Sequence, residues 1–416
     1  MRFALSAGLA LALLFPTFVQ AESTWQVTVD AGKFDRTNVP VVTLVTVSQD
    51  EANATIVELA GDKEQGKLVG QLTQPGLLAK VPAGKSSELA RELHFIVPAL
   101  VAGETRTYQA KVLTDASPSP QFAWKDTPGK QMDLTFGERP VLRYMYERVD
   151  NSNKDRRSET FKVYHHLYDP AGKRLVTKGP GGLFPHHRGV FYGFNKISYD
   201  GKSADTWHCN NGESQTHEKF LSQAAGPVLA RQRLAIDWHG KDDQVFAQEE
   251  REITIYNTPG GILLEFASLL NTTGGPVKLD GDPQHAGFQF RASQEVPDKT
   301  AAQTYYLRPD GKDKPGSFRN WPANKEHTNL PWNALSFVLG DQRYTCCYLD
   351  RPENPKESRF SERNYGRFGS YFEYELTKDQ PLELNYRLWL QEGELSVEGV
   401  TAQSEDFVEP PVVSVK

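Results

Sequence analysis

The chain has 416 residues, of which 38% are hydrophobic and 24% are charged, and its formal net charge is −6. These values are typical of a globular protein with a large core, and an acidic chain lacks the basic face that binds nucleic-acid phosphates. Nucleic acid is therefore excluded as a partner. The three cysteines exclude a disulfide-rich scaffold and leave open one bridge, from Cys209 to Cys346 or Cys347.

Residues 1–21 have the pattern of a secretory signal peptide. Arg2 supplies the positive charge, residues 4–15 form the apolar stretch, and residues 19–21 provide a small-residue cleavage site. The apolar stretch is too short to span a membrane, and no later segment approaches the roughly 20 apolar residues that a span needs. We therefore expect an exported protein, periplasmic or extracellular, that does not span the membrane.

Residues 22–115 contain short runs in which apolar and polar residues alternate. Turn residues separate the runs at intervals of roughly 8–12 residues, which is the spacing of a small antiparallel sandwich. The runs cover residues 25–32, 39–47, 54–61, 67–72, 92–100 and 105–113. We predict an immunoglobulin-like β-sandwich over residues 22–115, followed by a proline-containing linker at 116–125.

Alternating runs continue from residue 126 to about residue 400, and helical periodicity is scarce. The runs cover residues 132–149, 159–173, 190–199, 228–238, 246–256, 262–270 and 382–393. A β domain of this size usually stacks two extended sheets, with its site on a concave face or at loop ends. The predicted fold is all-β: an N-terminal immunoglobulin-like β-sandwich, a larger β-supersandwich domain at 126–400 and a C-terminal tail at 401–416.

The segment from residue 184 to residue 219 concentrates chemistry. It contains His186, His187, His208 and His217, and eight of the ten histidines lie between residues 165 and 285. Imidazole transfers protons near neutral pH and binds transition metals. We therefore predict that this segment forms the floor of an active site.

His187, His217 and His285 are predicted to hold one divalent metal ion or to share acid–base catalysis. Three histidines with one open position are what a catalytic metal centre requires, although the spacing matches no named metal motif. In an extended segment, His186 and His187 would point to opposite faces, so that only one faces a ligand. The alternative for this pair is a loop that it holds through hydrogen bonds.

Arg188 and Trp207 complete the predicted site in this segment. The guanidinium fork of Arg188 suits a carboxylate or a pair of sugar hydroxyls, so we place it among the catalytic residues. Trp207, beside His208, offers an aromatic platform that could stack on a sugar ring. The alternative for such an aromatic side chain is a place in the core of a sheet.

The segment QHAGFQFRAS predicts a strand with one polar face. His285, Gln289 and Arg291 would share that face, and the apolar residues between them would face the core. A buried polar stripe needs partners, so it lines a wet groove or pairs with carboxylates such as Asp282. We predict that Gln289 and Arg291 bind substrate.

Asp350, Asn354 and Arg363 lie in two later segments that are rich in proline and glycine. Loops on a rigid sheet often carry functional sites. These residues are predicted to bind substrate, and solvated surface charge is the alternative.

Several segments resemble, in order and spacing, a bacterial family of unknown function commonly labelled "PmoA" or "methane oxygenase PmoA". The resemblance covers about residues 132–394. The matching segments are RPVLRY, YHHLYDPAGK, PHHRGVFYGF, DTWH, THEKF, HAGFQFRAS, LDRPENP, RNYGRFGSYF and LNYRLWLQEGE. The oxygenase label does not suit this chain, because particulate methane monooxygenase is an integral membrane complex.

The resemblance implies an exported protein of polysaccharide-degrading bacteria, and therefore a carbohydrate ligand. The family pattern falls on His165, His186, His187, Arg188, His217, His285, Arg291, Asp350, Asn354 and Arg363. It departs at Val163-Tyr164-His165-His166, so either His165 or His166 is the equivalent residue. We accordingly add His165 and His186 to the predicted substrate-binding residues.

We predict an exported carbohydrate-active protein that cleaves glycosides, including those of keto-sugars, as a hydrolase or a lyase. The chain has no GxSxG elbow, which disfavours a serine hydrolase. Two alternatives stay open. One is a non-catalytic module that binds a glycan or another small molecule, and the other is a cell-envelope assembly protein that docks through its N-terminal sandwich.

Overall fold

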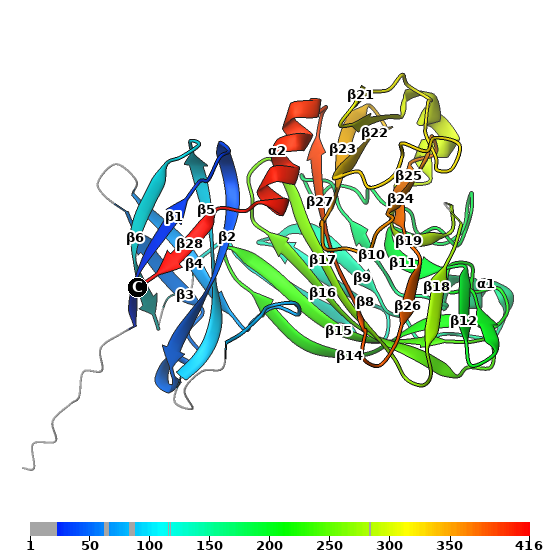
Figure 1. Cartoon of the computed structure of the whole chain (residues 1–416), viewed down its shortest axis with the longest axis horizontal. Coiled ribbons are helices and arrows are strands. Elements are labelled where there is room, and N and C mark those ends of the chain that lie inside the picture. The colour runs from blue at the N-terminus through cyan, green and yellow to red at the C-terminus, as the bar shows by residue number, and fades with distance from the viewer. Residues whose placement is uncertain (1–22, 62–65, 83–87, 115, 117, 283) are drawn as a thin grey trace, which may run out of the picture.

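A computed structural model describes residues 23–61, 66–82, 88–114, 116, 118–282 and 284–416 (Figure 1). The predicted signal peptide lies outside the described residues. The described chain is almost entirely antiparallel β-structure, which confirms the predicted all-β fold. Its α-helices are α1 (Lys154–Thr160) and α2 (Val397–Val408). No helix in the described ranges combines the length and apolar character that crossing a membrane requires.

The N-terminal strands form a curled sheet around their own hydrophobic core. The described part of this sheet has seven strands, in the order β2 (Arg36–Ser48), β5 (Glu88–Leu100), β4 (Lys67–Thr73), β3 (Ile56–Ala60), β6 (Thr105–Leu113), β1 (Thr24–Asp30) and β28 (Val412–Val415). Strands β1 to β6 coincide with the six predicted runs. Because alternate residues of a strand face one side, Val27, Val45 and Leu59 meet in a core separate from that of the larger domain.

The C-terminal residues return to the N-terminal sheet. Helix α2 buries Val400 and Phe407 against the larger domain, and β28 then pairs with β1, as the red and blue strands of Figure 1 show. Arg36 of β2 forms an ion pair with Asp406 of α2 at 2.9 Å. Residues 401–416 therefore join the two domains and do not form a separate tail.

A buried ion-pair network also joins the two domains. Glu92 of β5 accepts a hydrogen bond from Arg231 of β15 (Leu229–His239) at 2.7 Å, and Nε2 of His94 lies 3.2 Å from the same carboxylate. Burial by itself would raise the pKa of Glu92, but the His94 hydrogen bond and the Arg231 charge outweigh it and lower the pKa to about 2. Glu92 is therefore ionised at neutral pH and contributes to domain docking.

We expect the folded protein to lose stability as the pH falls from about 4.5 to about 2. Because the pKa of Glu92 is about 2 when folded and 4.5 ordinarily, the unfolded chain takes up the proton first. At about 1.4 kcal/mol per pH unit, the loss is about 3 kcal/mol. His94, whose pKa burial also lowers, acts in the same direction. Unfolding midpoints of wild type and Glu92→Gln across this range test the expectation, and equal pH dependence in both proteins would contradict it.

Two large sheets packed face to face form the second domain. In the described chain, the first sheet has eight strands, in the order β24 (Arg359–Arg363), β25 (Arg367–Tyr371), β19 (Ala286–Arg291), β11 (Val190–Phe194), β10 (Tyr164–Leu167), β9 (Arg139–Met145), β8 (Gln131–Phe136) and β7 (Phe122–Thr127). The described second sheet has nine, in the order β14 (Ser214–Ala225), β15, β16 (Val245–Tyr256), β17 (Gly261–Thr272), β27 (Leu382–Glu392), β23 (Gln342–Asp350), β22 (Trp332–Leu339), β20 (Tyr305–Arg308) and β21 (Gly311–Lys312).

A smaller sheet and the first strand of the domain complete this architecture. The smaller sheet contains, in order, β13 (Lys202–Ala204), β12 (Lys196–Tyr199), β18 (Val277–Asp280) and β26 (Tyr374–Leu376). Strand β7 begins at Phe122, inside the linker predicted at 116–125. The described connection between the domains is therefore shorter than the prediction.

Alternation along β19 separates the core from the outer face of the eight-stranded sheet. Phe288 stacks on Tyr386 of the opposite sheet at 4.9 Å, and Phe290 is also buried in this core. Gln289 and Arg291 therefore point to the outer face, as the alternation predicts. This outer face carries the site described below.

The three cysteines are buried and unpaired. Cys346 lies in the core between the two large sheets, whereas Cys347 faces the hydrophobic cluster under α2. Adjacent residues of a strand face opposite ways, which explains why these two thiols do not meet. The bridge that the sequence left open is not formed.

Candidate metal centre

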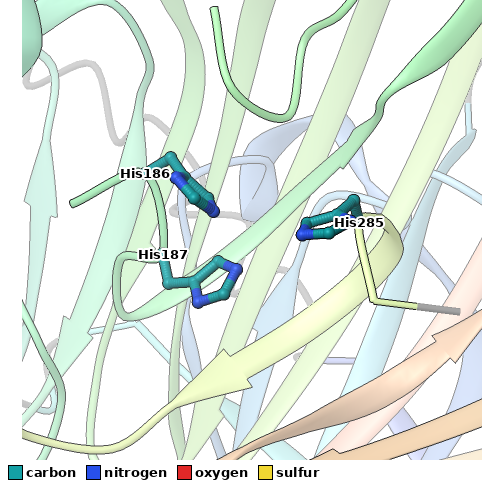
Figure 2. A group of neighbouring side chains, drawn as sticks. All are labelled: His186, His187 and His285. Carbon is teal, nitrogen blue, oxygen red and sulfur yellow. The ribbon is translucent and has the colours of Figure 1, made fainter. Parts of the chain in front are cut away.

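Three histidines from distant parts of the chain converge on the outer face of the eight-stranded sheet (Figure 2). His186 and His187 precede β11, and His285 precedes the neighbouring strand β19. One ring nitrogen from each residue lies within 4.8 Å of the other two. Zinc bound by imidazoles at about 2.1 Å needs its nitrogens about 3.4 Å apart, so modest side-chain rotation would close the set around an ion. We call these three residues the histidine cluster.

A tight turn places His186 and His187 on the same side of the chain. The backbone N–H of His187 donates to the carbonyl of Phe184 at 3.0 Å, and the two imidazole rings are 4.3 Å apart. The extended segment expected from the sequence would have separated them. Gly189 then leads into β11 with a φ of +49°, and a Cβ there would lie 2.1 Å from the carbonyl oxygen of His165. Only glycine fits this close approach.

Two carboxylates orient histidines at the cluster. The Asp282 carboxylate lies 2.8 Å from Nδ1 of His285, and the Asp205 carboxylate lies 2.7 Å from Nδ1 of His208. A carboxylate at Nδ1 holds the proton there and leaves the Nε2 lone pair free. The His208 ring is 4.4 Å from that of His186 and 4.7 Å from that of His285. His208 is therefore placed to act as a fourth ligand or as a proton acceptor.

Burial keeps His186 and His187 in the neutral form. Burial, reinforced by the Lys162 charge, lowers the pKa of His186 to about 2, and burial lowers the pKa of His187 well below its ordinary value. Among the described residues, neither nitrogen of His187 nor Nε2 of His186 has a hydrogen-bond partner. Neutral imidazoles with free lone pairs are the form that binds metal ions.

Two buried lysines hold the backbones that carry these histidines. Lys162 donates to the carbonyls of Thr206 and Trp207, directly before His208. Lys178 donates to carbonyls of the loop that ends in His187. Burial lowers the pKa of Lys162 to about 8 and that of Lys178 to about 7. These lysines fix the positions of the loops before any ligand binds.

Arg188 has a structural place in this arrangement and not the predicted catalytic one. Its guanidinium donates to the backbone carbonyls of Ser158, Glu159 and Pro185. It also lies over the ring of Phe161 at 4.1 Å. Each guanidinium nitrogen donates to a backbone carbonyl and the side chain is 0% exposed, so Arg188 holds the loop and helix α1 together.

The structure places His217 apart from His187 and His285. His217 lies near the start of β14, which belongs to the nine-stranded sheet. Its Nδ1 lies 3.3 Å from the hydroxyl of Tyr144. The three-histidine set of the structure therefore contains His186 in place of His217. The loop before His217 leads into the nine-stranded sheet and does not turn back toward the site.

Neither His165 nor His166 belongs to the histidine cluster. His165 stacks on Tyr144 at 4.6 Å and is fully buried in the sheet. His166 points the other way, and its Nδ1 lies 3.0 Å from Oγ1 of Thr177. Burial lowers the pKa of His166 to about 4. The position of His165 therefore gives no support to its predicted contact with substrate.

The aromatic surface at the site comes from Phe184 and Tyr365, and not from Trp207. Trp207 is 0% exposed and packs edge-on beneath His187 at 5.5 Å, so neither face of its indole can stack on a ligand. Phe184 is 40% exposed, and its ring lies 5.1 Å from that of the partly exposed Tyr365 and 5.5 Å from that of His187. An aromatic rim thus borders the histidine cluster.

The polar stripe of β19 extends toward this rim. Gln289 accepts a hydrogen bond from Arg367 at 2.9 Å and donates to the carbonyl of Ala286. Arg291 lies over the ring of Tyr365 at 4.8 Å. Arg363 stands on the strand next to that of Arg367. The structure therefore brings Gln289, Arg291 and Arg363 to the same side of the domain as the histidine cluster.

Asn354 lies at the junction with the N-terminal domain, and Asp350 binds its side chain. Asn354 lines a cavity of about 530 Å³ together with Glu92 and Arg231. Asp350 accepts hydrogen bonds from Asn354 at 2.6 Å and from Lys356 at 2.9 Å. The cavity lies on the outer face of the nine-stranded sheet, so these two residues do not join the histidine cluster.

The structure gives roles to Asp205, His208 and Arg367, to which the sequence led us to assign none, and it places Asp282 against His285 as the sequence allowed. Asp205 and His208 are three positions apart, and so are Asp282 and His285. Both pairs form the same carboxylate–imidazole contact, so the repeated D-x-x-H spacing was a signal that could have identified them. Arg367 carried no such signal.

A family model described as "Family of unknown function (DUF6807)" matches residues 131–405. This match confirms the resemblance to a domain of unknown function, and none of these comparisons carries the PmoA label. A comparison with curated proteins finds no match.

Two solved structures from Enterococcus faecalis resemble the fold distantly. One is described as a protein in the glycosyl hydrolase family 38, with 7% identity, a TM-score of 0.47 and coverage of 94% of this chain and 47% of that one. The other, from strain V583, is described as an alpha-mannosidase, with 8% identity, a TM-score of 0.46 and coverage of 96% and 47%. This chain spans about half of their length, and so distant a likeness carries no functional argument.

Proposed function

Because this chain belongs to the family of unknown function DUF6807, we propose from its site that it is an exported, metal-dependent enzyme that cleaves glycosidic bonds. The observation that carries the proposal is the histidine cluster. Its three imidazoles converge within 4.8 Å, beside the Asp205–His208 pair. Three ligands with an open position and an adjacent acid–base group are the parts of a hydrolytic metal centre.

In this proposal, each residue of the site has a distinct role. His186, His187 and His285 hold the ion, which polarises a substrate oxygen when bound. Asp282 orients His285, and Asp205 keeps the Nδ1 proton on His208 so that its Nε2 can accept a proton.

The glycosidic bond can be cleaved by hydrolysis or by elimination, and each reaction requires one proton acceptor. In hydrolysis, His208 takes a proton from water as the water oxygen bonds to the anomeric carbon, and the proton passes to the leaving oxygen as the glycosidic bond breaks. In elimination, His208 takes the proton from a carbon, a carbon–carbon double bond forms as the bond to the leaving oxygen breaks, and the proton passes to that oxygen. The products differ, since only hydrolysis incorporates water.

The aromatic rim supports carbohydrate as the substrate class. Aromatic rings stack on the apolar faces of sugars, and Phe184 and Tyr365 present theirs beside the histidine cluster. Phe184 also has a φ of +54°, which is uncommon for a residue other than glycine. A strained, exposed aromatic residue beside three histidines is consistent with ligand binding.

The test is turnover of neutral, acidic and keto-glycosides by the protein as isolated, after chelation and after metal is restored. We expect product only with metal, and a loss of at least about 100-fold in His208→Ala with metal content retained, because general acid–base catalysis contributes about 10²- to 10⁴-fold. Half-buried His217 lies outside the histidine cluster, on the nine-stranded sheet, and His217→Ala provides the matched control.

Two results would overturn the enzyme proposal. Glycan binding without product at every metal loading would identify a binding module. No glycan binding in any form would leave an assembly role, for which the docking of the N-terminal domain would be the next target.

A further inference from the structure

Three arginines lie side by side across neighbouring strands of the eight-stranded sheet. Arg291 of β19 is directly opposite Arg367 of β25, which is directly opposite Arg363 of β24. Side chains directly opposite each other point to the same face, and like charges in such pairs repel. We call these residues the arginine row.

Two members of the arginine row are buried and short of hydrogen-bond acceptors. Arg291 and Arg367 are both 0% exposed. Arg291 uses Nη1 on the carbonyls of Ala292 and Tyr365, whereas its Nε and Nη2 have no partner in the part of the chain that the structure describes. The same holds for Nε of Arg367. Burial lowers the pKa of Arg291 to about 10, which reflects the cost of placing its charge there.

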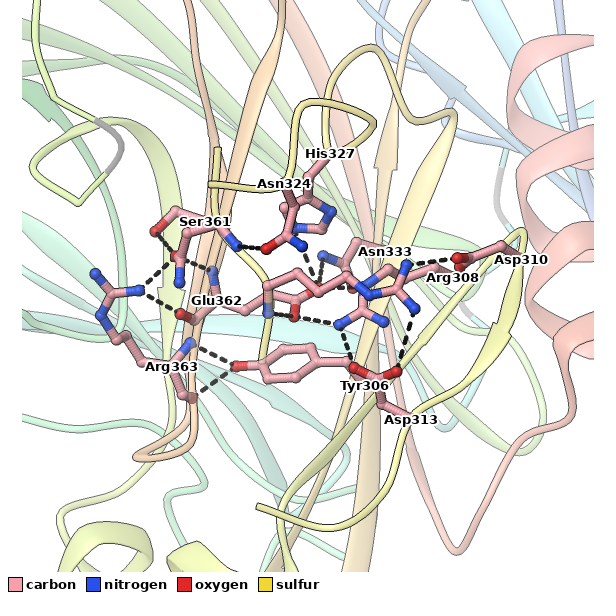
Figure 3. A network of polar contacts seen from close by, with 12 residues as sticks. Tyr306, Arg308, Asp310, Asp313, Asn324, His327, Asn333, Ser361, Glu362 and Arg363 are labelled. Carbon is pink, nitrogen blue, oxygen red and sulfur yellow. Dashed lines mark hydrogen bonds and ion pairs between the residues drawn. The ribbon is translucent and has the colours of Figure 1, made fainter. Parts of the chain in front are cut away.

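No carboxylate among the described residues forms an ion pair with the arginine row. Glu362, the adjacent acid, faces the other side of β24, where it binds Arg308 and Asn333 (Figure 3). Arg363 points away from that network and donates to the side chain of Asn320 and to the backbone of Glu362. Buried cations are costly unless they are paired, so the unpartnered donors of Arg291 and Arg367 are suited to an anion.

The arginine row adjoins the histidine cluster. Arg291 lies over the Tyr365 ring, which is nearly parallel to the His187 ring, at 18° and a centroid distance of 6.2 Å. Gln289, which binds Arg367, is directly opposite Phe191, and the rings of Phe191 and His187 are 6.1 Å apart. The cluster and the row are therefore neighbours on one face of the sheet, with Tyr365 between them.

We propose that the substrate carries a carboxylate, as a uronic acid residue does, and that Arg291 and Arg367 bind this carboxylate beside the histidine cluster. The inference rests on the proposed function and names its substrate class. The N–H fork of a guanidinium matches the two oxygens of a carboxylate. Tyr365, at the turn between β24 and β25, covers Arg291 and must move aside, while the partly exposed Arg363 supplies positive charge at the entrance.

Titration calorimetry with matched sugars tests the proposal. The acidic probes are methyl glucuronide and methyl galacturonide, and the neutral probes are methyl glucoside and methyl galactoside. We expect the acidic sugar of one pair to bind about 10- to 100-fold more tightly than its neutral partner, the range typical of a hydrogen bond to a charged group. Arg367→Gln should abolish this preference, Arg367→Lys should keep part of it, and the control Arg233→Gln, a partly exposed arginine paired with Glu250, should leave it unchanged.

Equal binding of acidic and neutral sugars by the wild type would overturn the proposal, as would an undiminished preference in Arg367→Gln. Acetate and a sulfated methyl galactoside are used to identify the anion that the site binds. Tighter binding of the sulfated sugar than of the uronide would also overturn the proposal. If Arg367→Gln does not fold, wild-type melting temperatures replace the variant: a larger rise with uronide than with neutral sugar at the same ionic strength supports the proposal, and an equal rise overturns it.

Metal-dependent turnover without acidic preference leaves the proposed function standing and removes only this inference. A preference for acidic sugars without turnover leaves the carboxylate site standing and removes the proposed enzymatic function.

Discussion

Replacing His285 by alanine is expected to remove the bound metal ion from the protein. His285 is one of three converging imidazoles, and Asp282 already orients it at 2.8 Å. Loss of an orienting partner alone typically lowers metal affinity 10- to 100-fold, so loss of the ligand itself should cost more than about 100-fold. Elemental analysis of the dialysed proteins by mass spectrometry measures the effect. We expect near-stoichiometric metal in the wild type and little in His285→Ala.

The control for this experiment also separates the two candidate ligand sets. His186→Ala should behave like His285→Ala, whereas His217→Ala should keep its metal, because His217 lies on the nine-stranded sheet. Metal that survives His186→Ala and disappears in His217→Ala would restore the set predicted from the sequence. Asp282→Asn should fall between these extremes, since it removes the orienting charge and keeps the ligand.

Replacing Arg188 by methionine is expected to destabilise the whole domain. Its buried guanidinium satisfies the carbonyls of Ser158, Glu159 and Pro185, and methionine would leave these acceptors without donors. Hydrogen bonds to charged groups contribute about 1.5–3 kcal/mol each, so we expect a loss of at least about 3 kcal/mol. Chemical unfolding monitored by near-UV circular dichroism measures it.

Arg233→Met serves as the matched control for this variant, because Arg233 is partly exposed and pairs with Glu250. Exposed pairs of this kind contribute about 0–1 kcal/mol. If Arg188→Met unfolds like the wild type but loses turnover, Arg188 has the catalytic role that the sequence indicated. Loss of stability with residual turnover in the folded fraction would establish the structural role.

Strands were the most predictable part of this protein. Alternating valines and leucines in β1 to β6 bury one face in a local core, so the pattern of burial is visible within a few residues. Helix α2 was missed although Val400 and Phe407 have helical spacing and Ser396 caps it by accepting from Gly399. Its 12 residues follow a long β domain, and only contacts with distant strands show that it is buried.

The sequence predicted the types of residue that form the site, but not every individual residue. Of the predicted set, the structure brings His187 and His285 together, because they precede adjacent strands, and it adds His186, which the sequence had placed on the opposite face from His187. His217 was misplaced because the sequence does not say which sheet receives the next strand. Trp207 packs beneath His187, and backbone carbonyls hold the guanidinium of Arg188, so the structure gives neither residue the place predicted for it.

The sequence by itself determined the all-β fold and the polar stripe of β19, because alternation along a strand depends only on local geometry. It also determined which residue types could bind a metal ion. Only the tertiary structure decided which histidines meet, since the turn at Phe184 and the pairing of β11 with β19 bring together residues about 100 positions apart. The arginine row likewise exists only through strand register, which places three like charges opposite one another.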